Sequence, residues 1–333
     1  MSASPIEPAS TAFLFVTHFW SRAVLREYKK IERAVEGLGT PWLIFQGEDD
    51  GLAQKYRIGN ISYQSRRDLD ALGYPMIAAS LLPGSAHFLL LNFYKTHPHY
   101  AHYWWIEYDV RFSGNWRTFF VECARLQADL LTGHVFHYRE VPNWNHWSLT
   151  HPTRSIPLED RIRCLHPVMR VSNAALDFLC AAHQDGWCGH SEVVLPSLLH
   201  AHGCSLADFG GVGDFVPPGM RNKFYRAPRI DWRGKRTGET YRYRPSFFLT
   251  GPRRNKLYHP VKPFQDVWKE RTREYRKLLL PPELWPKKYR DGRRARPWQT
   301  TVKVQIRRYV DFFIGKARAE RVVAALKKAF RPG

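Results

Sequence analysis

Apolar runs and amphipathic segments alternate along the first two thirds of the chain. The continuous apolar run 12–18 has the length and the β-branched and aromatic content of a buried strand. Ser21 can cap a following helix, in which apolar residues recur every three or four positions until Gly39 and Pro41 end it. Residues 42–45 form a second apolar strand. This order predicts a parallel β-α-β unit whose strands are buried on both faces.

The same alternation continues further along the chain. The polar segment between Gly47 and Leu82 is expected to be mainly loop with short elements. Beyond it, the sequence predicts an α/β fold, followed by a basic, mainly helical C-terminal extension. The expected strands are 103–110, 129–134 and 168–171, and the expected helices are 85–94, one capped by Ser172, one starting near Glu192 with Pro196 in its first turn, 264–280 and 302–330.

Basic charge is concentrated at one end of the chain. The 333 residues include 51 Lys and Arg against 30 Asp and Glu, a formal net charge of +21. Residues 1–220 hold 18 basic and 21 acidic side chains, whereas residues 221–333 hold 33 and 9. The first part is therefore nearly neutral, and the excess belongs to the last third. We expect residues 1–263 to form the main domain and 264–333 the basic extension.

The composition indicates a folded protein of the cytoplasm. With 44% hydrophobic and 14% aromatic residues, the chain is not globally disordered. Residues 1–11 lack the features of a secretion signal, and no apolar run is long enough to span a membrane. Five cysteines, an odd number, favour free thiols in a reducing compartment over a disulfide framework.

Two acidic residues close the strand predicted at 103–110. Side chains alternate along a strand, so Glu107 and Asp109 are expected to share one face at its carboxyl end. Open α/β sheets bind ligands beyond the carboxyl ends of their strands, and Mg²⁺ or Mn²⁺ prefers oxygen ligands. The pair is therefore a candidate metal site. The alternative is a solvated strand end without function.

A second candidate is Glu192, which follows a Gly-Trp-Cys-Gly-His-Ser stretch and precedes an apolar helix. The helix dipole would favour the ionised carboxylate, while packing against Trp187 would raise its pKa. Such a carboxylate can serve as a general base, and a helix-capping role is the alternative. The histidines and cysteines of 183–204 do not have the spacing of a standard zinc site.

Three stretches, in this order, resemble glycosyltransferases of the GT-A type, the nucleotide-diphospho-sugar transferase fold. They are Trp-Trp-Ile-Glu-Tyr-Asp-Val-Arg-Phe-Ser-Gly-Asn-Trp116, Gly-Trp-Cys-Gly-His-Ser-Glu192 and Asn-Lys-Leu-Tyr-His-Pro-Val-Lys262. They look like a poorly characterised family of such proteins, labelled a domain of unknown function. The likeness covers about residues 12–262 and implies a GT-A-like α/β fold with a mixed, mostly parallel sheet flanked by helices.

The resemblance implies a role for each matching residue. Asp109 and the late His259 would hold Mn²⁺ or Mg²⁺, and Glu107, at the first acidic position, would face the donor. Thr17 and His18 would help to form the nucleotide pocket, and Lys262 would contact the diphosphate. Glu192 would be the catalytic base of an inverting enzyme. Trp144, Trp147 and Trp187 are weaker candidates for stacking on acceptor sugars, with core packing as the alternative.

The basic third leaves other partners open. Its mixture of arginines and aromatic residues also suits a nucleic-acid-binding protein, although no named nucleic-acid motif is present. The helix expected at 302–330 has an apolar stripe beside basic residues, which suits either an anionic membrane surface or packing on the main domain. We expect a transferase that uses a nucleotide-sugar donor and a glycan or glycolipid acceptor. A peripheral position at the inner membrane face would fit such an acceptor.

Overall fold

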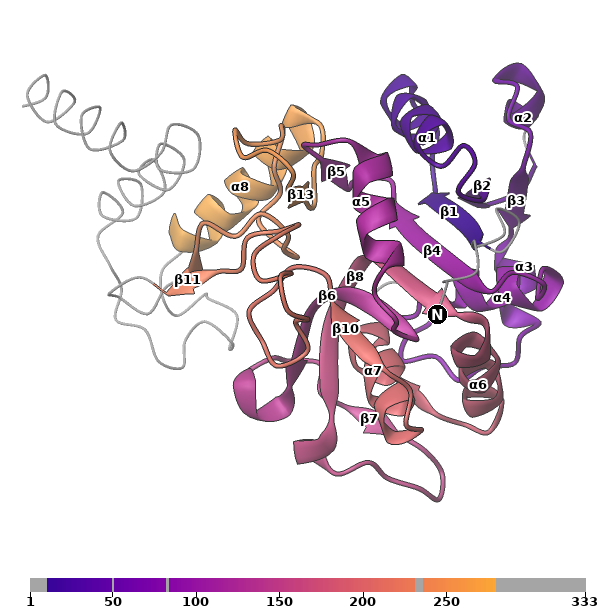
Figure 1. Cartoon of the computed structure of the whole chain (residues 1–333), viewed down its shortest axis with the longest axis vertical. Helices are drawn as coiled ribbons and strands as arrows, with labels where there is room; N and C mark the ends of the chain where they lie inside the picture. Colours follow the sequence, from indigo (N-terminus) through magenta and orange to yellow (C-terminus); the bar gives the residue numbers. More distant parts are fainter. Residues whose placement is uncertain (1–10, 50, 82–83, 231–235, 280–333) are drawn as a thin grey trace, which may run out of the picture. The chain divides into compact units, whose positions relative to one another are not determined.

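The computed structural model describes residues 11–49, 51–81, 84–230 and 236–279 (Figure 1). The chain divides into two compact units. The first, here called the sheet unit, comprises Met1–Val110 and Gly114–Phe224; the second, the C-terminal unit, comprises Arg111–Ser113 and Tyr225–Gly333. The domain boundary expected between 263 and 264 stays a prediction, and the helix expected at 302–330 lies outside the described residues.

A seven-stranded sheet is the centre of the sheet unit. Strands pair in the order β10-β6-β8-β4-β1-β2-β3, and only β8 runs antiparallel to its neighbours. This confirms the α/β class and the mixed, mostly parallel sheet. The strands are β1 (Thr11–Thr17), β2 (Thr40–Gln46), β3 (Ile61–Gln64), β4 (His102–Glu107), β6 (Leu130–His137), β8 (Ile162–Ser172) and β10 (Leu206–Asp208).

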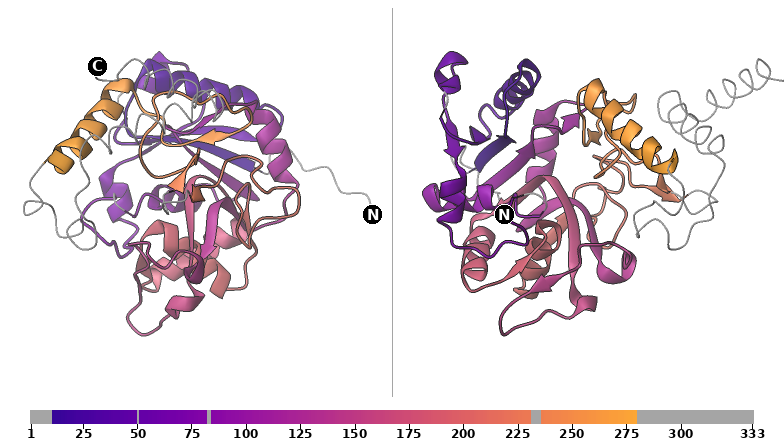
Figure 2. Two further views of the ribbon diagram at one scale, coloured as in Figure 1. Left: turned by 90° about the vertical axis from the view of Figure 1, so that its left-hand side faces the viewer. Right: turned by 180° about the vertical axis from the view of Figure 1, so that it is seen from behind.

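Helices cover both faces of this sheet (Figure 2). Alternation along β1 sends Phe13 and Phe15 to one face, where Phe13 contacts Phe120 and Phe15 contacts Tyr28. Leu14 lies on the other face, in the largest apolar cluster. The helices of the first face are α1 (Arg22–Ala34) and α5 (Trp116–Ala124); those of the second are α4 (Phe88–Thr96), α6 (Asn173–Gln184) and α7 (Ser191–Ala201).

Helix starts follow the local sequence. The hydroxyls of Ser21 and Ser172 accept hydrogen bonds from the first turns of α1 and α6, as expected. Helix α1 ends earlier than Gly39, and Gly37 takes the left-handed conformation (φ 70°) that favours glycine. Helix α7 begins at Ser191, so Pro196 lies in the helix interior and not in the first turn. That expectation was wrong because the helix starts immediately after His190.

Shorter elements complete the two units. The segment after β2 is loop with short elements, as expected. In the C-terminal unit, β5 (Arg111–Phe112) pairs with β13 (Leu257–Tyr258), and α8 (Phe264–Leu279) confirms the helix expected at 264–280. The remaining elements are α2 (Leu52–Lys55), α3 (Arg66–Asp70), η2 (Tyr138–Glu140), β7 (Leu149–Thr150), η3 (Leu158–Asp160), β9 (Cys188–Gly189), β11 (Arg229–Ile230) and β12 (Arg236–Thr237).

All five cysteines carry free thiols. Within the described ranges, no helix has both the length and the apolar character needed to cross a bilayer.

A buried arginine connects the sheet to the end of α5. Arg170, 5% exposed on β8, donates hydrogen bonds to the backbone carbonyls of Cys123, Leu126 and Ala128. We expect Arg170→Met to lower the unfolding free energy by about 3 kcal/mol, because three carbonyls lose a charged donor. Denaturant unfolding measures this, with exposed Arg125→Met as the control, expected to change stability by less than about 0.5 kcal/mol. Equal effects of the two variants would contradict the assignment.

Candidate functional site

The carboxyl ends of β1 and β4 form the switch point of the sheet. After β1 the chain adds β2 and β3 on one side, whereas β4 pairs with β1 on the other side. Crossovers leave such neighbouring strands in opposite directions, which opens a crevice outside their carboxyl ends. The residues that follow these two strands therefore hold the position where α/β sheets bind ligands.

The loop after β1 contributes a hydroxyl and several rings. Thr17 is buried, and its hydroxyl donates a hydrogen bond to the carbonyl of Phe19 (2.8 Å). The exposed ring of His18 lies edge-on to Tyr108, which follows β4 (centroids 5.2 Å apart), and Phe19 contacts the same ring at 4.9 Å. The ends of β1 and β4 are thus in contact, and Thr17 and His18 lie at the switch point.

Glu107 and Asp109, at the end of β4 and just beyond it, do not share a strand face. Strand β4 ends at Glu107, and the amide of Val110 donates to the carbonyl of Glu107 (3.1 Å), so Asp109 lies in a turn. The side-chain alternation expected through 110 is therefore wrong, because the backbone leaves the extended conformation after Glu107. Asp109 is nonetheless held firmly, with only 4% of its surface exposed.

His259 is positioned within the C-terminal unit. It is 6% exposed, and its Nδ1 lies 2.6 Å from the carbonyl oxygen of Arg242. A carbonyl only accepts, so Nδ1 carries the proton and Nε2 has the lone pair that a metal ligand needs. Lys262 is half-buried, and its amide donates to the carbonyl of Phe247.

Chain continuity relates His259 to the acidic turn. Arg111 of β5 pairs with Tyr258 of β13; Asp109 precedes Arg111 by two residues, and His259 directly follows Tyr258. Glu107 and Asp109 of the sheet unit carry carboxylates, and His259 of the C-terminal unit carries an imidazole; each is a group that can bind a metal ion. Carboxylate oxygens with one imidazole nitrogen suit a divalent cation.

Glu192 lies in the first turn of α7 in the sheet unit. Its backbone amide donates to Nδ1 of His190, the residue that caps the helix. Burial raises the pKa of Glu192 to about 7, and the nearby guanidinium of Arg163 opposes this shift. A carboxyl with a pKa near neutrality gains and loses a proton readily at physiological pH, which is the property of a general acid or base.

The surroundings of Glu192 are rich in rings and cations. The ring of His190 stacks on His146 (4.6 Å) and lies edge-on to Trp144, and the guanidinium of Arg163 lies over Trp144 at 4.6 Å. Burial, with the positive field of His146, His166 and Arg163, lowers the pKa of His190 to about 3. The sequence did not single out Arg163, His146 or His166, because no local pattern relates them to Glu192.

Strand β8 connects this cluster to the switch point. Val168 of β8 lies opposite Ile106 of β4, so His166 lies just beyond the register of the last β4 residues. Two and three residues earlier on β8 are Cys164 and Arg163, and the carboxylate of Glu192 contributes to the raised pKa of buried Cys164. Antiparallel pairing thus brings Glu192 toward the edge of the sheet where Glu107 lies.

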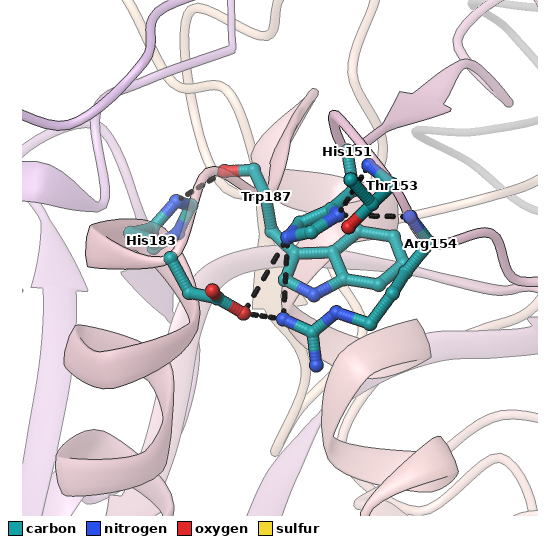
Figure 3. A network of polar contacts seen from close by, with 6 residues as sticks. His151, Thr153, Arg154, His183 and Trp187 are labelled. Atoms are coloured by element: carbon teal, nitrogen blue, oxygen red, sulfur yellow. Dashed lines mark hydrogen bonds and ion pairs between the residues drawn. The ribbon is translucent and has the colours of Figure 1, made fainter.

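The loop that precedes Glu192 is fixed by a network of polar contacts (Figure 3). Arg154 forms an ion pair with Asp185 and places its guanidinium over the ring of Trp187. His151 accepts hydrogen bonds from the amides of Thr153 and Arg154, and its ring lies 4.9 Å from that of Trp187. The strand pair β7 and β9 adds backbone hydrogen bonds. These contacts hold the start of α7 in place.

Two buried histidines extend this network. Nδ1 of His183 lies 2.9 Å from the carbonyl oxygen of Trp187, so it is the donor, and Nε2 of His183 accepts from Nε2 of His87 at 3.0 Å. Both rings are neutral, because burial lowers the pKa of His183 to about 4 and that of His87 well below its usual value. His87, at the start of α4, is thereby connected through His183 of α6 to the loop before α7.

We expect His183→Phe to reduce stability by about 2 kcal/mol at neutral pH, because the Trp187 carbonyl and His87 Nε2–H lose their partners. The unfolded chain protonates His183 below its usual pKa of 6.5, whereas the folded protein keeps it neutral to about 4. Wild-type stability therefore falls as pH decreases from 6.5 toward 4, and the variant should show a weaker fall. Urea unfolding across this range measures both effects. The exposed His99→Phe is the control for stability at neutral pH and should unfold as wild type does. A His183→Phe variant as pH-dependent as wild type would contradict the argument.

The tryptophans considered for acceptor binding are not equally placed. Trp147 and Trp187 are buried, and His151 and Arg154 lie against the ring of Trp187. Trp144 is only half-buried and lies beside His190. Of the three, Trp144 is the residue best placed to meet a ligand near Glu192.

Comparisons with known proteins add a fold likeness only. No protein-family model matches the chain, and no curated protein matches it. Among solved structures, 4-diphosphocytidyl-2C-methyl-D-erythritolsynthase from Anaerococcus prevotii DSM 20548 is similar over 63% of this chain and 92% of its own, with a TM-score of 0.37 and 6% identity. A protein from Bacillus anthracis named as a glucose-1-phosphate thymidylyltransferase is similar over 60% and 86%, with a TM-score of 0.35 and 9% identity. Both likenesses are distant, so the choice of a function depends on this chain's own side chains.

Proposed function

We propose that the protein is a metal-dependent, inverting glycosyltransferase that moves a sugar from a nucleotide-sugar donor to a hydroxyl acceptor. The observation that carries the proposal is the position of the acidic turn at the switch point of the sheet. In the same unit, β8 connects this edge to Glu192, a carboxyl with a pKa near neutrality. Acidic ligands and a proton acceptor are the two groups that glycosyl transfer requires.

The donor diphosphate would be bound by cationic groups. By the resemblance, Asp109 and His259 would hold Mn²⁺ or Mg²⁺, which would neutralise charge on the leaving diphosphate, and Glu107 would face the donor. Lys262 would add a positive charge at the diphosphate. Thr17 and His18 would contact the nucleotide at the end of β1. The rings of Phe19 and Tyr108, which the sequence did not single out, contact each other at this position and would pack against the nucleotide.

Glu192 would act on the acceptor. Its ionised carboxylate takes the proton from the acceptor hydroxyl as that oxygen forms a bond to the anomeric carbon of the donor sugar. The bond from the anomeric carbon to the diphosphate oxygen breaks, and its electron pair leaves with the nucleoside diphosphate. Attack from the face opposite the leaving group inverts the configuration. The ring of Trp144 would stack on the acceptor sugar.

The proposed acceptor is a lipid-linked or cell-surface glycan. The excess of basic residues after 220 would then hold a cytoplasmic enzyme at the inner face of a membrane. The proposed position at the membrane is argued from net charge, whereas the proposed glycosyl transfer is argued from the residues at the edge of the sheet.

A screen for nucleoside-diphosphate release tests the proposal. Wild-type protein is incubated with UDP- and GDP-sugars, glycan acceptors and Mn²⁺, and with the same mixtures containing a chelator. We expect release with at least one donor and loss of release with the chelator. Binding of DNA or RNA with a steep salt dependence, and no binding of any donor nucleotide, would instead identify a nucleic-acid-binding protein.

A further inference from the structure

Four large apolar side chains are unusually exposed in the C-terminal unit. Tyr243, Leu249, Phe264 and Trp268 are 66%, 58%, 61% and 59% exposed. The other exposed large apolar side chains of the described residues lie in the sheet unit and are at most 42% exposed. These side chains fall within 26 successive positions. Contact of so much apolar surface with water is unfavourable, and a bound partner would remove it. We call these four residues the exposed patch.

Ring contacts join the two parts of the patch, which are helix α8 and the loop 243–249. Phe264 and Trp268 are one turn apart on α8, and their rings stack with centroids 6.3 Å apart. The ring of Phe248, next to Leu249 in the chain, packs edge-on against Phe264 at 5.7 Å. The loop 243–249 therefore runs alongside the first turns of α8.

The other end of this loop is also fastened to α8. Glu270 accepts a hydrogen bond from the hydroxyl of Ser246 (2.6 Å) and lies 3.4 Å from Arg244, whose guanidinium is placed over the ring of Tyr243. The exposed rings are thus presented from a loop and a helix that brace each other. Ordering the patch on binding costs little further entropy.

The charge around the patch is positive. Residues 225–279 contain 16 Lys and Arg against 5 Asp and Glu. Within the segment that carries the patch, Arg244, Arg254 and Lys269 are exposed, and Asp266 is an exposed acidic residue. Exposed aromatic and aliphatic side chains in a segment with an excess of exposed basic residues are typical of surfaces that lie in the headgroup region of a bilayer.

We propose that the exposed patch docks onto a membrane surface rich in anionic phospholipid. Trp268, Phe264 and Leu249 would enter the interfacial region, while the flanking basic side chains face the phosphate groups. The strong exposure of Leu249 favours this partner over a nucleic acid, because an aliphatic side chain adds nothing to phosphate tracking or base stacking. The proposal does not depend on the transferase activity.

Vesicle sedimentation of the full chain tests it. The probes are phosphatidylcholine vesicles with and without phosphatidylglycerol, at low and high salt. We expect wild-type protein to bind the anionic vesicles, more weakly at high salt. The double variant Phe264→Ser, Trp268→Ser should bind at least about tenfold more weakly, because it loses two interfacial rings. Leu249→Ser should have an intermediate effect.

Matched controls are Ile77→Ser and Leu158→Ser, which remove exposed apolar side chains of the sheet unit (42% and 39% exposed) and should not change binding. Thermal unfolding confirms that each variant is folded. Equal partition of wild type and the double variant would overturn the proposal. So would a change in the oligomeric state of the double variant by light scattering, which would assign the patch to a contact between copies. Loss of oligonucleotide binding in that variant, with vesicle binding intact, would assign it to nucleic acid.

Discussion

Replacing Asp109 with Asn should reduce nucleoside-diphosphate release by roughly 1,000-fold. Asp109 is buried at the switch point of the sheet, and its proposed role is that of a metal ligand. The amide keeps the shape of the carboxylate but lacks its charge, so the metal ion would be held weakly. Metal stabilisation of a leaving diphosphate supplies several kcal/mol, and each 1.4 kcal/mol corresponds to about a factor of ten in rate.

Metal binding gives a second readout that does not require a known acceptor. Titration of Mn²⁺ followed by calorimetry should show at least about tenfold weaker binding to Asp109→Asn than to wild type. The control is Asp214→Asn, which changes an exposed aspartate paired with Arg139 and should leave metal binding and turnover unchanged. Wild-type Mn²⁺ affinity in Asp109→Asn would remove Asp109 from the metal site.

Replacing Glu192 with Gln should lower kcat by about 100- to 10,000-fold, the usual contribution of a general base. Binding of the donor should change little, because Glu192 lies at the start of α7 and its proposed role is to act on the acceptor. Donor affinity and kcat measured together therefore separate this variant from Asp109→Asn. The exposed Glu159→Gln is the matched control and should behave as wild type.

The pH dependence should report the same carboxyl. Only ionised Glu192 can accept a proton, and burial raises its pKa to about 7. For wild type, kcat/KM should rise about tenfold per pH unit below 7 and level off above it. The residual activity of Glu192→Gln should lack this limb. A wild-type profile that is flat between pH 5 and 8 would show that Glu192 is not the base, because this range extends at least about one pH unit to either side of the pKa of Glu192.

Stability should change in the opposite direction from activity. The folded protein keeps Glu192 protonated up to about pH 7, whereas the unfolded chain releases this proton near 4.5. Its stabilising contribution is complete below 4.5 and is lost as pH rises through 7. Glutamine does not titrate, so Glu192→Gln should unfold at a higher denaturant concentration than wild type at pH 8. An inactive variant that is also less stable there would indicate a structural role instead.

Local sequence was a good guide wherever a neighbouring residue decides the outcome. Ser21 and Ser172 cap their helices because a hydroxyl before a helix meets the amides of its own first turn. The run 12–18 became β1, since a continuous apolar segment is stable only where both faces are covered. Even so, the position of Pro196 in α7 was missed, because the capping side chain proved to be that of His190.

Candidate residues were predicted where position along a strand or helix fixed them. Glu107 and Glu192 could be selected because each lies at the end of a recognisable element. The turn at Asp109 could not, since leaving the strand after Glu107 depends on the backbone hydrogen bond from Val110. Nor could the sequence show that His259 is protonated on Nδ1, which requires the carbonyl of Arg242.

By itself, the sequence determined the α/β alternation, the helix caps, the acidic strand end and the concentration of basic charge after residue 220. These features depend on residues close together in the chain, where steric preferences and periodicity act. Only the tertiary structure decided that β8 is antiparallel, that Arg163 lies near Glu192 and His166 near His190, and that Phe264 and Trp268 are exposed. Strand pairing, desolvation and exposure are set by residues distant in sequence, so no local pattern encodes them.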